Sequence, residues 1–145
     1  MNMVFCVFCL AGLILSAPAF ASDDISRGQQ IIEFCWDKGG DHVSKVMCEE
    51  TSLNMLKKKM KEIYDTRIKE AQKSDREMKE EGSLAFVDTE QSVVKSQKAF
   101  DAYMKEECDR QVAYVMGGSF GADTDIGCKI NLISERIAVL NKAKQ

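Results

Sequence analysis

The sequence predicts an all-α fold, a small disulfide-stapled helical bundle of about four helices built on one long helix hairpin. Three observations favour this fold class. Apolar residues return at steps of three and four along most of the chain. No stretch alternates apolar and polar residues with the period of a strand. The only proline, Pro18, lies near the start, so none remains downstream to break a helix.

Length and composition are those of one globular domain. The chain has 145 residues, of which 45% are hydrophobic and 30% charged. Its net charge of −3 argues against nucleic acid as a partner, because phosphate binding requires a surplus of basic residues. The single histidine, His42, disfavours a histidine-built metal centre. We expect no metal and no cofactor.

The first 21 residues have the form of a signal peptide. They carry no charged side chain, and their apolar run, residues 4–15, is short for a membrane span. Ala19 and Ala21 supply the small side chains of a cleavage site. We therefore expect residues 1–21 to be removed, residues 22–145 to form one domain, and the product to be periplasmic or secreted. A retained anchor is the alternative, because no Lys or Arg precedes the apolar run.

The six cysteines fall into two sets, one in the leader and one in the domain that follows it. Cys6 and Cys9 form a C-x-x-C pattern inside the leader, without the strand-to-helix context of a redox pair. The remaining cysteines predict two disulfides, with more than one connectivity open. We favour Cys35–Cys48 and Cys108–Cys128, because each pair brackets a glycine-containing turn between helical stretches. These four cysteines contain no close pair of the kind a zinc site uses, which disfavours such a site.

The first half of the domain predicts a short helix and a long one. The capping-box sequence Ser26-Arg27-Gly28-Gln29 predicts a first helix that ends near Lys38-Gly39-Gly40. A second helix is expected over about residues 43–80, with Gly82 as its C-cap, and it would be roughly 55 Å long. Its last turns should project or bend, because that length exceeds a compact domain of this size. Its inner face carries Val46, Leu53, Leu56, Met60, Ile63, Tyr64, Ile68 and Ala71.

The second half predicts two more helices after a linker at residues 83–89. Asp88-Thr89-Glu90-Gln91 offers a cap for the third helix, whose inner face runs from Val93 to Val115. We expect a flexible turn over Gly117–Ala122. A fourth helix should follow, with Asp123 as its N-cap and an apolar face from Ile126 to Leu140.

An ordered set of motifs then connects the chain to a known family. Residues 97–108 read QKAFDAYMKEEC, and Gly117-Gly118-Ser119, Cys128 and Ser134-Glu135-Arg136 follow. The chain resembles the N-terminal domain family of the LprI-type lysozyme inhibitors from roughly Cys35 to Leu140. The resemblance implies an exported four-cysteine helical domain and inhibition of lysozyme. It also implies structural roles for Gln97, Phe100, Tyr103 and Arg136.

The chain departs from the family pattern at three positions. Phe100 stands where the family favours Trp, and Met104 stands where Arg is common, so an ion pair made by that Arg is absent. Arg136 follows Ser134 more closely than in some members. The resemblance therefore supports fold and export better than it identifies a target.

Catalytic chemistry has little support in the sequence, and we expect a protein that is not an enzyme. His42 is interpreted as an exposed loop histidine, since no Ser or Cys partner is evident. Glu106-Glu107 is interpreted as solvated surface, and Asp123-x-Asp125 lacks the full ligand series of a calcium loop. Lys57-Lys58-Lys59 is interpreted as a solvated helix face. Gln97 and Arg136 are expected to form a core hydrogen bond or to snorkel.

The candidate binding segment is the loop Gly117, Gly118, Ser119, Phe120. Bridged by Cys108 and Cys128, it would lose little entropy on entering a partner's cleft. The alternative is that Phe120 folds back over the helix ends.

Two function hypotheses remain open. The first is a non-enzymatic secreted or periplasmic inhibitor of lysozyme or another peptidoglycan hydrolase, without nucleic acid or stable membrane insertion. The second is an envelope adaptor that uses the long helix past Ala71 as its interaction element.

Overall fold

The computed structural model describes residues 22–82, 88–116 and 118–142, apart from the side chains of residues 22–26 and Ser119. Within these ranges the chain forms four helices and no strand, so the predicted all-α class is confirmed. The expected leader, residues 1–21, lies outside the described residues. None of the helices described is long and apolar enough to cross a membrane.

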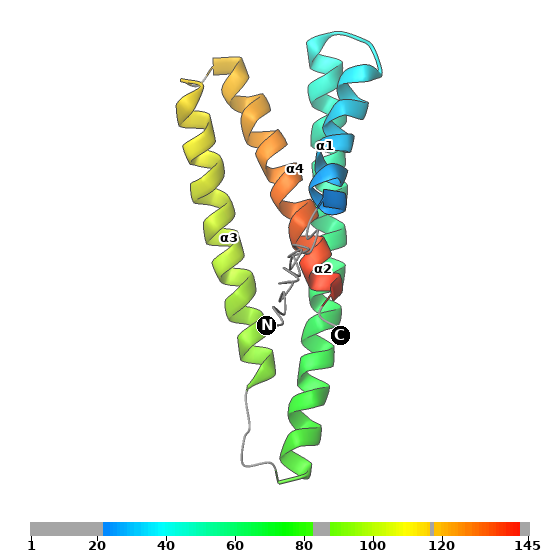
Figure 1. The fold of residues 1–145 in the computed structure, drawn as a ribbon, viewed down its shortest axis with the longest axis vertical. Helices are drawn as coiled ribbons and strands as arrows, with labels where there is room; N and C mark the ends of the chain where they lie inside the picture. The colour runs from blue at the N-terminus through cyan, green and yellow to red at the C-terminus, as the bar shows by residue number, and fades with distance from the viewer. Residues whose placement is uncertain (1–21, 83–87, 117, 143–145) are drawn as a thin grey trace, which may run out of the picture.

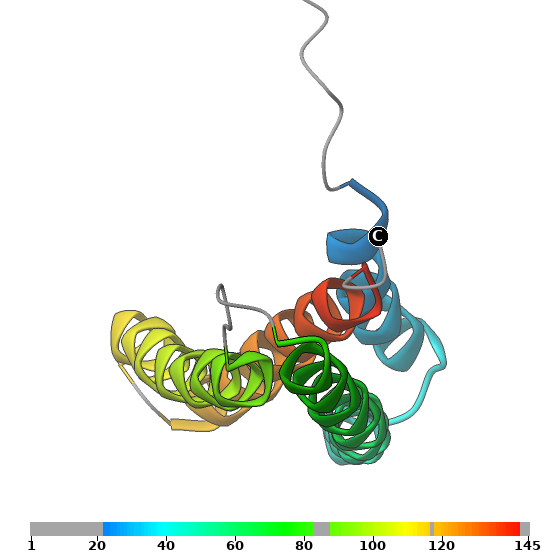
Figure 2. The ribbon, with the colours of Figure 1, turned by 90° about the horizontal axis from the view of Figure 1, so that it is seen from below.

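The four helices form two hairpins whose turns lie at the same end of the molecule (Figure 1). The first hairpin pairs α1 (Ser22–Asp37) with α2 (His42–Glu80), and the second pairs α3 (Thr89–Tyr114) with α4 (Gly118–Lys142). Seen from below, α4 lies between α3 on one side and α1 and α2 on the other (Figure 2). The α1–α2 and α3–α4 turns therefore lie at one end of the bundle, and the end of α2 and the start of α3 lie at the other.

The central element is α4, which lies between α3 and the α1–α2 pair and has more extensive contacts with the other three helices than α2 has (Figure 2). Its apolar side chains recur every three or four residues and fill the core, and Ile130 and Ile133 are fully buried. Removing such a side chain from water contributes about 2 kcal/mol. The buried core consists of Leu53, Leu56, Ile126, Ile130, Ile133 and Ile137.

Each hairpin is closed by one disulfide, and these are the two pairings favoured from the sequence. Cys35 bonds to Cys48 with a Cα–Cα separation of 5.6 Å, and Cys108 bonds to Cys128 with a separation of 5.7 Å. Cys35 and Cys108 are almost completely buried. The two bonds therefore tie α1 to α2 and α3 to α4 close to the turns.

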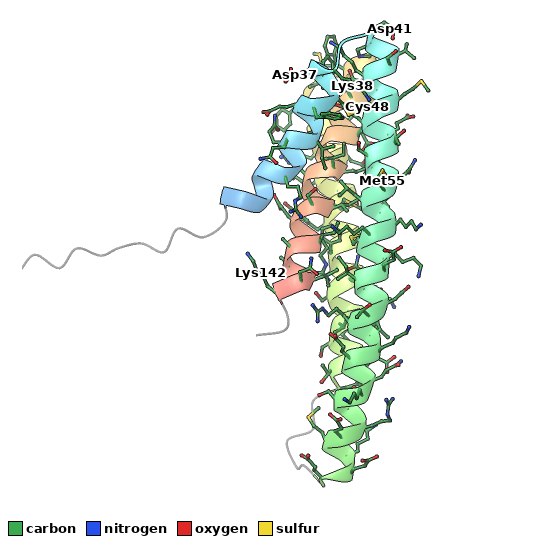
Figure 3. All side chains as sticks on the ribbon, turned by 90° about the vertical axis from the view of Figure 1, so that its right-hand side faces the viewer. Asp37, Lys38, Asp41, Cys48, Met55 and Lys142 are labelled. Atoms are coloured by element: carbon green, nitrogen blue, oxygen red, sulfur yellow. A yellow bond between two sulfur atoms is a disulfide. The ribbon has the colours of Figure 1, made fainter. Side chains whose placement is uncertain are left out.

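The long helix α2 continues well past the end of α4 (Figure 3, where Lys142 marks the end of α4). Arg67 of α2 is buried and holds that end, donating from Nε to the carbonyl of Leu140 at 2.6 Å and from Nη2 to that of Asn141 at 3.3 Å. The last carbonyls of a helix have no partner within the helix, and a cation there also complements the helix dipole. Arg67 thus fixes where α4 stops against α2.

The last turns of α2 pack against the start of α3, so they project past α4 without standing alone. The carboxylate of Asp75 accepts from the backbone N–H groups of Thr89 at 2.9 Å and Glu90 at 3.0 Å. These hydrogen bonds, led by that from Glu90, lower the pKa of Asp75. Asp88 accepts from Gln91 N–H at 2.7 Å, as the predicted N-cap. The first turn of α3 therefore has two carboxylates satisfying its free N–H groups.

Three helix boundaries can be compared with the sequence predictions. The first helix begins at Ser22, so the predicted start at Ser26 is wrong, because the chain is already helical through that position. The second helix begins at His42 with Asp41 as its N-cap, accepting from Ser44 N–H at 2.8 Å. The C-cap of this helix is Glu81, so Gly82, the expected C-cap, lies one position past it. With φ of +67°, Gly82 still supplies the left-handed residue that follows the end of the helix.

One glycine sets the distance between α1 and α4. A Cβ built on Gly28 would lie 2.9 Å from the Cα of Asn131, which is too close for any side chain without a backbone shift. Gly28 is itself buried in this contact. The absence of a side chain therefore permits the close packing of these two helices.

Candidate functional site

The turn between α3 and α4 is short and adopts an unusual backbone conformation. After α3 ends at Tyr114, the N–H groups of Val115 and Met116 bond back to the carbonyls of Val112 and Ala113. Met116 has φ of +59° and Gly118 has φ of +72°. Positive φ is costly for a residue with a Cβ, and such strain concentrates at functional sites. The turn therefore holds Met116 in a conformation that glycine would adopt more easily.

Large apolar side chains are exposed around this turn. Met116 is 89% exposed, Tyr114 77%, Phe120 75% and Val115 41%. We call Tyr114, Val115, Met116 and Phe120 the apolar tip. Because Phe120 is mostly in solvent, the alternative in which it folds back over the helix ends is wrong. Exposed apolar groups gathered in one place are typical of interaction surfaces.

Packing beneath the apolar tip holds its two helices together. The Cys108–Cys128 disulfide joins α3 to α4 with both cysteines buried. Gly121 is buried, and a Cβ built on it would lie 3.3 Å from the side chain of Val112. Thr124 Oγ1 donates to the carbonyl of Phe120 at 2.7 Å. The tip is thus carried on two helices in close contact.

The structure corrects the expected flexible turn over Gly117–Ala122. The fourth helix begins at Gly118, so Gly118, Ser119 and Phe120 form its first turn. Gly117 and the side chain of Ser119 lie outside the described residues. The reason for the difference is tertiary, because Gly121 packs against α3 where a glycine-rich sequence suggested a loop.

Asp123 lies inside α4, so its predicted N-cap role is wrong. Its Oδ2 lies 2.7 Å from Nε2 of His42, across 81 positions of sequence. His42 is likewise not a loop residue, since it begins α2. This pair joins the α1–α2 turn to α4 close to the apolar tip, and the ring of Trp36 lies edge-on to His42 at 6.0 Å.

A buried carboxyl group lies next to this pair. Glu49 is 2% exposed and accepts from Trp36 Nε1 through Oε1, while its Oε2 is buried without a hydrogen-bond partner. Burial raises the pKa of Glu49, and the neighbouring Asp123 raises it further. Sequence analysis missed this residue because an isolated Glu on a charged helix carries no sign of burial.

One ion pair lies at the base of the apolar tip. Arg110 forms an ion pair with Glu107 and lies over the ring of Tyr114 at 5.3 Å. The hydrogen bond from Arg110 lowers the pKa of Glu107 to about 2, and the same contact raises the pKa of Arg110. Glu106 points into solvent, as expected for this segment, whereas Glu107 is half-buried. The arginine therefore orients an exposed aromatic ring through a cation–π contact.

The residues assigned structural roles by resemblance separate into two groups. Arg136 donates from Nε to Gln97 Oε1 at 3.1 Å and lies over the ring of Phe100 at 5.3 Å. Gln97 and Arg136 therefore share a hydrogen bond that is part-buried, between the two alternatives expected from the sequence. Tyr103 is 55% exposed and lies away from the core. Lys57, Lys58 and Lys59 are exposed on α2, as the sequence indicated.

Tyr114 and Met116 of the apolar tip were not identified from the sequence. Periodicity placed Val115 on the inner face of the third helix, but Val115 caps α3 and is 41% exposed. The available signal was the run Ala113–Met116, in which four consecutive residues are apolar or aromatic and which directly precedes two glycines. Among the described residues, no three His, Cys, Asp or Glu side chains are placed to hold a metal ion.

Comparison with known proteins assigns the chain to one family. No curated protein and no solved structure matched. The profile of the family described as lysozyme inhibitor LprI matches residues 35–140, which is most of the chain. The match begins at the first cysteine of the α1–α2 disulfide and ends at Leu140, the last buried residue of α4. The chain belongs to the lysozyme inhibitor LprI family.

Proposed function

We propose that this protein is an exported inhibitor of lysozyme or a related peptidoglycan hydrolase, and that the apolar tip is the surface that enters the target. The observation that carries the proposal is the exposure of Tyr114, Met116 and Phe120 on a disulfide-closed hairpin, in a member of an inhibitor family. The tip acts by occluding the substrate cleft and has no chemical step of its own.

The tip has the properties of a protein-binding element. Phe120 alone leaves roughly 150 Å² exposed, since a Phe side chain buries about 200 Å² when fully covered and Phe120 is 75% exposed. At about 25 cal/mol per Å², covering that area contributes about 3 to 4 kcal/mol before the costs of association. Interfaces draw most of their energy from a few such side chains.

The charge of the chain supports the same class of target. The net charge is −3, and residues 1–21 contribute none of it. Lysozymes are commonly basic, and an acidic partner gains faster association by electrostatic steering. Inhibition should therefore weaken as salt concentration rises.

An inhibitor of a peptidoglycan hydrolase has to be exported to meet its target. Two disulfides and membership of an inhibitor family fit an extracytoplasmic protein. We propose that residues 1–21 are a signal peptide and that residues 22–145 form the mature domain in the periplasm or outside the cell.

The test is a lysozyme clearing assay with the disulfide-intact mature chain and two pairs of matched variants. Met116→Ser changes the tip, and Met55→Ser makes the same change at an exposed site on α2. Phe120→Ser and Phe34→Ser form the second pair. We expect each tip variant to weaken inhibition by roughly tenfold to a hundredfold, as for interface hot spots, and each control to leave it unchanged.

Two outcomes would reject the proposal. Absence of inhibition of any muramidase at micromolar protein would remove the target class. Equal inhibition by tip and control variants would remove the tip as the binding surface. Loss of inhibition on deletion of residues 72–81 alone would favour the long helix, the element of the adaptor hypothesis.

A further inference from the structure

A second candidate site lies at the opposite end of α4 from the apolar tip. The helices α2 and α3 continue past the point where α4 ends (Figure 1). Together with the last turns of α4 they enclose a cleft of about 470 Å³. That volume is within the range of small-molecule sites. We call it the Arg136 cleft, and it is lined by Ala71, Val93, Val139, Leu140, Arg67 and Arg136 together with neighbouring polar residues.

The cleft combines an apolar surface with one cation that lacks a carboxylate. Arg136 is half-buried, and its hydrogen-bond acceptors are neutral, Gln97 Oε1 at 3.1 Å and Ser96 Oγ at 3.0 Å. No carboxylate among the described residues forms an ion pair with it. Arg67 and Arg110, by contrast, each have a glutamate partner.

Burial makes this lone cation costly and an anion favourable beside it. Removal from water lowers the pKa of Arg136, which Asp101 offsets only by its charge at longer range. A carboxylate that entered the cleft would pair with a half-buried guanidinium, and such charge-assisted hydrogen bonds are the strong ones. The hydrogen bonds to Gln97 and Ser96, together with the Phe100 ring, already hold the guanidinium in position.

A further carboxylate limits the charge that the site accepts. Glu70 lines the cleft and forms an ion pair with Arg67. A ligand with two or more negative charges would meet repulsion there, and a cationic ligand would be repelled by Arg136. The apolar side chains Val93, Val139 and Leu140 favour an alkyl tail next to the charged head.

We propose that the Arg136 cleft binds a single-chain amphiphile with one carboxylate, such as a medium-chain fatty acid. The carboxylate pairs with Arg136, and the alkyl chain lies along Val93, Val139 and Leu140. This site is independent of the proposed inhibitory surface, because it lies on the other end of α4.

Isothermal titration calorimetry of the disulfide-intact mature chain with dodecanoate, below its micelle concentration, tests the proposal. We expect saturable binding, no binding of dodecyltrimethylammonium, and affinity reduced by about tenfold or more in Arg136→Gln. Arg76→Gln is the matched control, since it makes the same change at an exposed arginine of α2 that does not line the cleft. Ser74→Phe should obstruct the cleft while leaving Arg136 unsubstituted, and it should also reduce affinity by about tenfold.

Circular dichroism shows whether each variant is folded. If Arg136→Gln does not fold, the result for Ser74→Phe decides the test. Equal binding of dodecanoate by the wild type and by Ser74→Phe would overturn the proposal. Binding of the cationic amphiphile at similar affinity would overturn it as well. Lysozyme inhibition by the folded Arg136→Gln variant should match the wild type, so failure of one proposal does not decide the other.

Discussion

Removal of the Cys108–Cys128 disulfide separates the contribution of a rigid tip from the contribution of overall stability. The perturbation is Cys108→Ala with Cys128→Ala, which leaves no free thiol and no buried hydroxyl. The bond closes a loop with a sequence separation of 20 residues, so the loop-entropy relation gives a loss of about 3.3 kcal/mol. A small domain of total stability about 5 to 15 kcal/mol would remain folded after this loss.

The second disulfide supplies a matched control. The Cys35–Cys48 bond has a sequence separation of 13, which gives about 2.9 kcal/mol by the same relation. The two double-alanine variants should therefore unfold at nearly the same urea concentration. Only the Cys108–Cys128 bond joins the two helices that carry Tyr114, Met116 and Phe120.

We expect the two variants to differ in the lysozyme clearing assay. Ordering three freed side chains costs about 0.5 to 1.5 kcal/mol each, so loss of the Cys108–Cys128 bond should weaken inhibition roughly tenfold or more. Loss of the Cys35–Cys48 bond should change inhibition by less than about twofold. Urea unfolding, followed by the fluorescence of the single tryptophan, Trp36, measures stability in parallel.

The reasoning is refuted if both variants lose inhibition to the same extent at matched stability. That result would mean that global stability, and not the closed α3–α4 hairpin, sets activity. Unchanged inhibition in both variants would show that packing alone, with Gly121 against Val112, holds the tip in place.

Two predictions concern the interior. Gly28→Ala should destabilise the protein by about 1 to 3 kcal/mol despite the higher helix propensity of alanine, because the new Cβ meets the backbone of Asn131, and urea unfolding measures the loss. The raised pKa of Glu49 predicts that its contribution to stability is fully present below about pH 4 and is lost as pH rises through the folded-state pKa, since the charged form is the one that burial disfavours. Glu49→Gln keeps an acceptor for Trp36 and cannot ionise, so this variant should match the wild type in acid and exceed it in stability at neutral pH. A stability difference between the two proteins that is independent of pH would contradict the assignment.

Much of the secondary structure is determined by the sequence itself. Helical periodicity and capping residues act over a few positions, which is why the extent of α2, the Asp88 cap and the terminating Gly82 agree with the structure. The disulfide pairing follows from the same local information, because each bond closes one helical hairpin.

The tertiary structure alone decided which helix is central and which polar groups meet. Periodicity identifies an apolar face but not the helix that it packs against. The sequence therefore suggested a bundle built on the long helix α2, and only the structure shows that α4 lies among the other three helices. The contact of His42 with Asp123 joins two helices across 81 positions of sequence, and the contact of Glu49 with Trp36 crosses the α1–α2 hairpin. The helical pattern of these segments does not encode which side chains meet. The exposure of Met116 and Phe120 likewise depends on α4 beginning at Gly118, where packing of Gly121 on α3 makes a helix of a glycine-rich segment.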